Sequence, residues 1–358
     1  MDAMTWPRIM LVAVAAAGSM AATWIMICSV LPSIRLREAA AVNLGSSAVA
    51  NTMPAGGALA MGISWAMLSS WGVSTAEYVL YTLVSGTWNV FARLGLPVVA
   101  VLVLLTDGRP GAGLIAAAAA GLALLAGATA GLGLLIRSES FALEAGRALQ
   151  RALTVIFRLV RRRVSFDIPG SLAGFRDRAS ILIAVRGWWI TVATLASNLT
   201  LWLVLLACLR GVGLSQGQVS WQTSLAAFAS IRLLTVLPVT PGGLGITELG
   251  LTGILLAGSH ALSSGASHQT VAQVTAAVLL YRAVTYLLPI PIGVIAWLTW
   301  RHAPGLLLGR LGSAAQQPHV AEPTGVSEPA GISDSGRVDS SLQVSGGFIR
   351  DELEKIHL

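Results

Sequence analysis

The sequence predicts an all-α integral membrane protein, a polytopic helical bundle in which two membrane segments are interrupted. Hydrophobic residues make up 55% of the 358 residues and charged residues 11%, whereas soluble domains carry about 25% charged residues. Several apolar runs reach the roughly 20 residues that a helix needs to cross a bilayer. Two apolar regions contain a proline beside a pair of glycines, and this combination breaks a continuous helix.

The apolar runs predict the membrane segments in chain order. They cover residues 9–31, 39–71, 77–106, 114–136, 187–209, 221–259 and 270–300. The first run is too long for the core of a signal peptide and lacks a small-residue cleavage site, so we expect a retained anchor. Pro97 predicts a kink within the segment 77–106.

The chain is predicted to have four parts. A first membrane half covers 1–136, with its interruption at 51–57, and a basic segment covers 137–186. A second membrane half covers 187–301, with its interruption at 238–245, and a polar tail covers 302–358. The tail is rich in Ser, Gly and Pro and has little apolar surface to bury, so we expect disorder there.

The basic segment 137–186 contains ten arginines against four acidic residues. It forms either an amphipathic helix on an anionic membrane surface or a solvated linker. In both cases the positive-inside rule predicts that it lies in the cytoplasm, beside a bacterial-type plasma membrane.

The rest of the chain is organised around the stretch 237–248. Its prolines and glycines are Pro238, Pro241, Gly242, Gly243 and Gly245. Helical spacing resumes at Ile246, with Thr240 and Thr247 as candidate caps and Glu248 where the helix dipole favours a carboxylate. Irregular backbone at membrane depth is tolerated only where protein buries it or where it lines a wet cavity. The stretch is therefore either the broken helix of a transport site or a plain kink or surface loop.

A similar pattern occurs earlier in the chain. Pro54 precedes Gly56 and Gly57 inside the apolar region 39–71. Interrupted segments in corresponding places of two halves indicate a transporter's binding site. Whether each interrupted segment crosses the membrane or re-enters stays open at this stage.

Four ionisable residues lie within apolar segments, where charges are costly and mark function. They are Arg93, Arg232, Glu248 and Arg282. Arg282 either pairs with Glu248 or, together with Arg232, binds a lipid phosphate, because a guanidinium matches phosphate in a bidentate manner. Arg93 is expected nearer an interface.

Other polar residues are expected to have structural roles. Asn51 and Asn198 are expected to form interhelical hydrogen bonds. His260 and His268 have no acidic or cysteine partner nearby and are expected to be solvated.

The pattern P-x-x-P-G-G-x-G-x-x-E at 238–248 resembles the signature of the flippase-like membrane domain of lysylphosphatidylglycerol synthases and their stand-alone relatives. The stretch 280–289 around Arg282 resembles that family's arginine-bearing last span, and the likeness covers about 9–300. It implies a module that handles or translocates lipids. The first interruption departs from the family's charged P-G-x-x-G-E-type motif, because 54–59 carries no charge. No aminoacyl-transferase domain follows 300, so we do not expect synthesis of an aminoacylated lipid.

The function predicted is translocation of an anionic phospholipid or lipid-linked precursor, with the head group near the broken helix. The predicted substrate-binding residues are Arg232, Pro238, Thr240, Pro241, Gly242, Gly243, Gly245, Glu248, Arg282, Pro54, Gly56 and Gly57. The partners expected are membrane lipids, without nucleic acid, and no cofactor or metal is expected.

The sequence leaves two rivals to translocation. A membrane-embedded transferase is disfavoured because magnesium-dependent lipid-phosphate chemistry needs clustered carboxylates, and Glu248 is the sole one deep in an apolar region. A non-catalytic scaffold that recruits cell-envelope proteins through the basic segment or the tail is the alternative.

Overall fold

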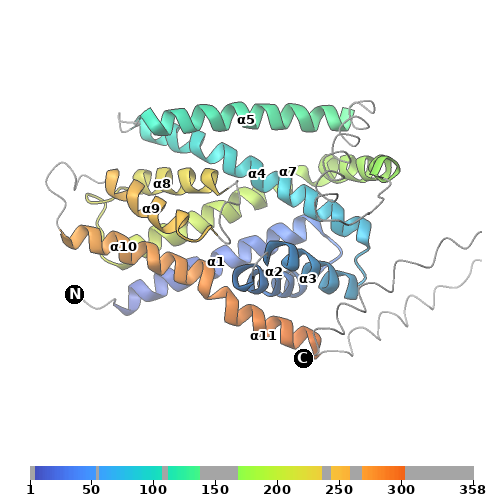
Figure 1. Cartoon of the computed structure of the whole chain (residues 1–358), viewed down its shortest axis with the longest axis horizontal. Helices are drawn as coiled ribbons and strands as arrows, with labels where there is room; N and C mark the ends of the chain where they lie inside the picture. Colours follow the sequence, from blue (N-terminus) through green and yellow to red (C-terminus); the bar gives the residue numbers. More distant parts are fainter. Residues whose placement is uncertain are drawn as a thin grey trace, which may run out of the picture. The chain divides into compact units, whose positions relative to one another are not determined.

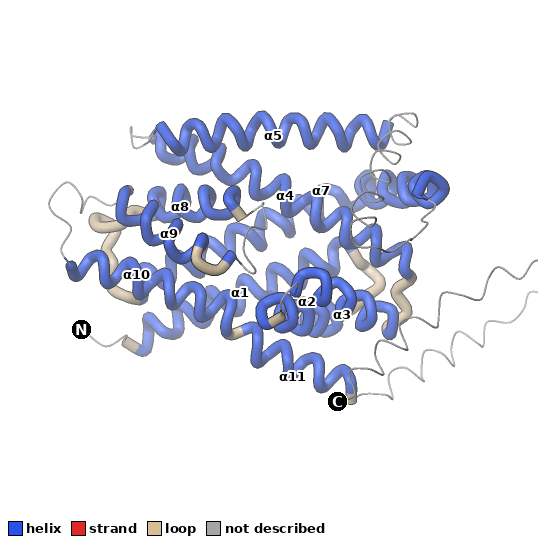
Figure 2. Tube along the Cα trace, in the orientation of Figure 1, coloured by secondary structure: helices blue, strands red, loops and turns tan. Residues whose placement is uncertain are grey.

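The computed structural model describes residues 5–53, 56–106, 112–137, 168–235, 243–258 and 268–302. Within these residues all regular secondary structure is helical, which confirms the predicted fold class (Figure 2). The helices are α1 (Trp6–Val30), α2 (Leu36–Thr52), α3 (Gly56–Ser70), α4 (Thr75–Thr106), α5 (Ala112–Arg137), α7 (Ile168–Gly211), α8 (Trp221–Leu234), α9 (Ile246–Ala257), α10 (His268–Arg282), the π-helical turn η3 (Ala283–Leu287) and α11 (Pro289–Arg301). The predicted disordered tail lies outside the described residues, apart from His302.

Four stretches of the described chain are long and apolar enough to cross a membrane. They are Trp6–Val30, Thr75–Leu105, Arg178–Gly211 and His268–Arg301. The predicted segment 114–136 is also one helix, α5. The chain is therefore an integral membrane protein.

Helix α7 is longer than the sequence predicts. It runs without a break from Ile168 to Gly211, 44 residues, or about 66 Å at the usual rise per residue. The hydrocarbon core is only about 30 Å thick. The span predicted from 187 is therefore the continuation of a helix that begins within the basic segment.

Both predicted interruptions are helix ends. The pairs α2–α3 and α8–α9 each meet at one, and the two members of each pair pack against each other (Figure 1). We call these pairs the first and second hairpins. Their helices have 17, 15, 14 and 12 residues, or about 18–26 Å each. Each is thus shorter than the hydrocarbon core is thick.

The last span joins the two hairpins. Helix α10 packs on α9 of the second hairpin, and α11 packs on α2 of the first, with η3 between them (Figure 1). The contact of α11 with α2 is close, since a Cβ added at Gly293 would overlap the carbonyl oxygen of Leu44. Small residues allow such approach between membrane helices.

Other contacts also link the two predicted halves of the chain. Helix α1 packs along α7, and α4 packs on α8. One buried cluster centres on α7 to α10 and includes Phe228, Leu251 and Leu255, all at most 1% exposed. The other joins α1 to α4 with the middle of α7. The two predicted membrane halves are therefore defined by their order along the chain only.

Candidate functional site

The second interruption resumes its helix where the sequence predicts, but a different residue caps it. Gly245 is the N-cap of α9, with φ of +81°. Its backbone N–H donates to Oε2 of Glu248 at 2.7 Å. Thr247 lies inside the first turn, so its predicted role as a cap is wrong, and Thr240 lies outside the described residues. The left-handed φ explains a glycine at this position, because a Cβ is disfavoured there.

Glu248 also binds the last span. Its Oε1 accepts a hydrogen bond from Nε of Arg282 at 2.6 Å, and the two side chains are only 23% and 13% exposed, respectively. The carboxylate lies in the first turn of α9, where the helix dipole favours a negative charge, and the guanidinium lies where α10 passes into η3. Of the two alternatives for Arg282, the structure contains the ion pair.

A chain of contacts leads from Arg282 to the first hairpin. The guanidinium lies over the ring of Tyr286, 4.5 Å from its centroid. The Tyr286 hydroxyl donates to the carbonyl of Asn51 at 2.8 Å, and Nδ2 of Asn51 donates to the carbonyl of Tyr286 at 3.1 Å. Asn51 is next to last in α2. The prediction of an interhelical hydrogen bond for Asn51 is confirmed, and the two interruptions are linked through η3.

Tyr286 lies in the π-helical turn Ala283–Leu287. Such turns within α-helices are frequent at functional sites. Tyr286 was not predicted from the sequence, although its spacing of four from Arg282 places the two side chains on one helix face.

A second polar group lies where α8 ends. Nη2 of Arg232 donates to Oδ1 of Asn198 at 2.8 Å, which confirms an interhelical bond for Asn198. Nη1 of Arg93 donates to the carbonyl of Thr235, the C-cap of α8, at 3.3 Å. Arg93 therefore belongs beside the second interruption, a position that the sequence analysis did not assign to it.

These two arginines are incompletely satisfied. The Nε atoms of Arg93 and Arg232 are both buried without a hydrogen-bond partner. Within the described part of the chain, neither forms an ion pair, and the two positive charges lie close enough to repel each other. Tyr281, 6% exposed, lies within electrostatic range of Arg232 and of Arg282. Tyr281 is thus near one arginine of each polar group.

The glycines of the predicted site fall into two kinds. Gly243, with φ of +68°, and Gly56 are sterically constrained, since an added Cβ would come within 2.9 Å of Thr247 Oγ1 and 2.5 Å of the Ala50 carbonyl oxygen, respectively. Gly57 has open space around its Cα. The remaining predicted site residues lie outside the described residues. They are Pro54, Pro238, Thr240, Pro241 and Gly242.

Among the described residues, neither histidine nor any group of metal-binding side chains contributes to the candidate site. His268 is exposed at the start of α10, and His260 lies outside the described residues. Across the described ranges, no group of three His, Cys, Asp or Glu side chains is placed to hold a metal ion.

Comparison with known proteins yields one family. The family model described as "Lysylphosphatidylglycerol synthase TM region" matches residues 1–293. No curated protein matches the chain. The matched region contains both interruptions and all four membrane charges discussed above.

Proposed function

The chain belongs to the lysylphosphatidylglycerol synthase transmembrane-region family, and we propose that it moves an anionic phospholipid or lipid-linked precursor between membrane leaflets. Family membership and four helices long enough to span a bilayer support a role with membrane lipids. The membrane proposed is a bacterial-type plasma membrane, with the basic segment on its cytoplasmic side.

The observation that carries this proposal is the pair Arg93 and Arg232. Each has a buried Nε without a partner, and neither has a carboxylate partner within the described residues. Uncompensated charge at membrane depth is costly and marks ligand sites. A lipid phosphate would supply the missing negative charge and acceptor oxygens, and guanidinium groups bind phosphate with strong charge-assisted hydrogen bonds.

Arg282 and Glu248 have a different part in this proposal. Because Nε of Arg282 is engaged by Glu248, we assign the pair to holding α9 against α10 at the edge of the phosphate site. Opening of the pair would release a third guanidinium nitrogen toward the head group. Gly243 and Gly245, both with positive φ, supply the turn from which α9 starts.

The link through Tyr286 and Asn51 would couple the two hairpins during transport. A shift of α9 is passed to Arg282, to η3 and then to the end of α2 through the contacts described above. We assign no chemical reaction to the chain. Glu248 is engaged by Arg282 and by the Gly245 N–H, and we propose that its role is structural.

The test is leaflet-resolved lipid movement in proteoliposomes, with fluorescent anionic phospholipids, a polyprenyl phosphate and a neutral lipid as substrates. Arg232→Gln and Arg93→Gln should each slow movement of the anionic substrate at least about tenfold, the factor expected for one lost hydrogen bond to a charged group, about 1.5–3 kcal/mol. Arg37→Gln is the matched control, because Arg37 is exposed and the charge change is the same.

Either of two results would count against the proposal. Folded wild-type protein that moves none of the lipids removes the translocase function and favours the scaffold. Equal slowing by Arg37→Gln and Arg232→Gln shows that general charge, rather than the site, is responsible.

A further inference from the structure

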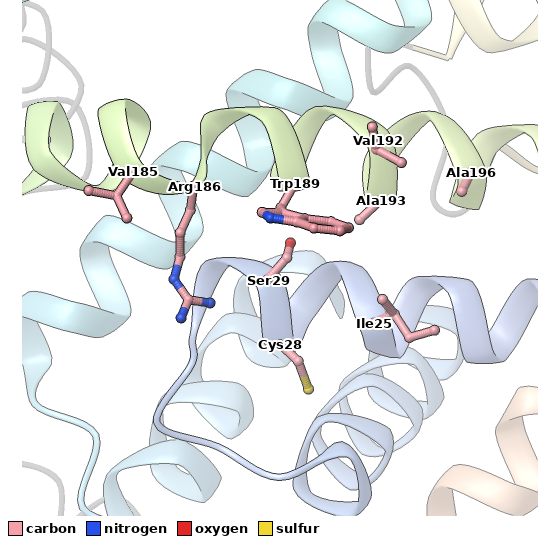
Figure 3. A pocket seen from close by; sticks show the side chains of 9 residues that line it. All are labelled: Ile25, Cys28, Ser29, Val185, Arg186, Trp189, Val192, Ala193 and Ala196. Carbon is pink, nitrogen blue, oxygen red and sulfur yellow. The ribbon is translucent and has the colours of Figure 1, made fainter.

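A groove between α1 and α7 lies apart from both polar groups of the candidate site. It encloses about 590 Å³, within the range of small-molecule sites. Its walls are almost entirely apolar and include Ile25 and Cys28 of α1 and Trp189 and Val192 of α7. Two polar residues also line it: Arg186 lies toward one end, which we call the polar end, and Ser29 lies opposite Trp189 (Figure 3).

The arrangement of the lining residues gives the groove a direction. Ile25 of α1 lies opposite the Val192–Ala196 part of α7, whereas Ser29 lies opposite Trp189 (Figure 3). The two helices therefore run antiparallel here. The polar end of the groove is the end nearer the start of α7, where the basic segment precedes it.

Arg186 and Trp189 lie at the start of the membrane segment that the sequence predicts from residue 187, within the apolar stretch Arg178–Gly211 of α7. Arginine and tryptophan at the end of a membrane segment suit the interface, with the apolar part in lipid and the polar tip at head-group level.

Charge identifies the occupant. Arg186 is half-buried and forms no ion pair within the residues that the structure describes. In sequence it ends the basic segment 137–186, in which arginines outnumber acids ten to four. Ser29 donates its hydroxyl hydrogen to the Met26 carbonyl at 2.7 Å, which leaves Ser29 Oγ as an acceptor for a head-group hydroxyl.

We infer that this groove binds one anionic glycerophospholipid. An acyl chain lies along the apolar walls between Ile25 and Val192, and the phosphate is bound by Arg186. This site is separate from the proposed translocation site, and it holds whether or not the protein moves lipid.

The test uses Trp189 as the reporter, with the full chain in vesicles. Quenching by phosphatidylglycerol with brominated acyl chains is compared with quenching by brominated phosphatidylcholine. The chain has 11 tryptophans, so the Trp189 signal is the difference between wild type and Trp189→Phe. Trp188→Phe provides the same difference for an adjacent exposed indole that does not line the groove.

Half-maximal quenching of Trp189 should need about fivefold less phosphatidylglycerol than phosphatidylcholine, the factor expected for one basic residue near an anionic surface. Arg186→Gln should remove this preference and Arg186→Lys should keep part of it. Arg178→Gln, an exposed arginine earlier on α7, should leave it intact. Trp188 should show no preference.

Three results would overturn the inference. Equal quenching of Trp189 by the two lipids means that the groove meets only bulk lipid. Equal loss of preference in Arg178→Gln and Arg186→Gln means a diffuse electrostatic effect. Absence of quenching by either lipid means that a protein surface, such as a second copy of the chain, covers the groove. Lipid movement is also measured for Arg186→Gln. This second measurement separates failure of the groove inference from failure of the translocase proposal.

Discussion

Replacing Glu248 by alanine should destabilise the protein more than loss of a helix cap alone. The substitution removes the carboxylate that binds Arg282 at 2.6 Å and the acceptor of the Gly245 N–H at 2.7 Å. Arg282 is only 13% exposed, and removing one partner of a buried ion pair costs about 3–5 kcal/mol. Because the pair is not fully buried, we expect about 3 kcal/mol.

Glu77 is the matched control for this substitution. It accepts the backbone N–H of Ser74 at 2.9 Å, three positions before it, as Glu248 does with Gly245. Glu77 is exposed and has no described arginine partner. Glu77→Ala should therefore cost only about 1 kcal/mol, the usual value of a helix cap. The difference between the two variants measures the ion pair.

The assay is equilibrium unfolding in mixed micelles with increasing denaturing detergent, followed by tryptophan fluorescence. A double variant, Glu248→Ala with Arg282→Met, should recover most of the loss, because it removes the isolated charge and keeps apolar volume. The reasoning fails if Glu248→Ala costs no more than Glu77→Ala. It also fails if the double variant is as unstable as Glu248→Ala.

Four further substitutions test the geometry by the same unfolding assay. Gly245→Ala should cost about 1–2 kcal/mol because of its left-handed φ, whereas Gly253→Ala in open space on α9 should stabilise by up to about 1 kcal/mol; equal effects would contradict the assigned backbone. Tyr286→Phe should cost about 1 kcal/mol through its lost bond to Asn51, and no change would remove the link between hairpins. Gly293→Ala should cost about 1–3 kcal/mol by forcing α11 from α2, and a neutral result would refute that close contact.

Much of the fold could be predicted from the sequence because its signals are local. The length of an apolar run decides whether a helix can span the bilayer, and proline beside glycine decides where a helix stops. For this reason the end of α2 near 53, the end of α8 near 235 and the restart of α9 at Ile246 were predictable. The cap was not, since Gly245 acts through its φ and the Glu248 side chain rather than through a hydroxyl.

The sequence by itself determined the fold class, the two interruptions and the presence of four charged residues within apolar segments. Only the tertiary structure decided which of those charges are compensated. The partners of Arg282, Arg93 and Asn51 lie 34, 142 and 235 positions away, and hydropathy contains no information on such pairings. Helix packing brings Glu248 to Arg282 and leaves Arg93 beside Arg232 without a counter-charge in the described chain. The physical reason is that desolvation and Coulomb energies depend on distance in space, which spacing along the chain does not specify.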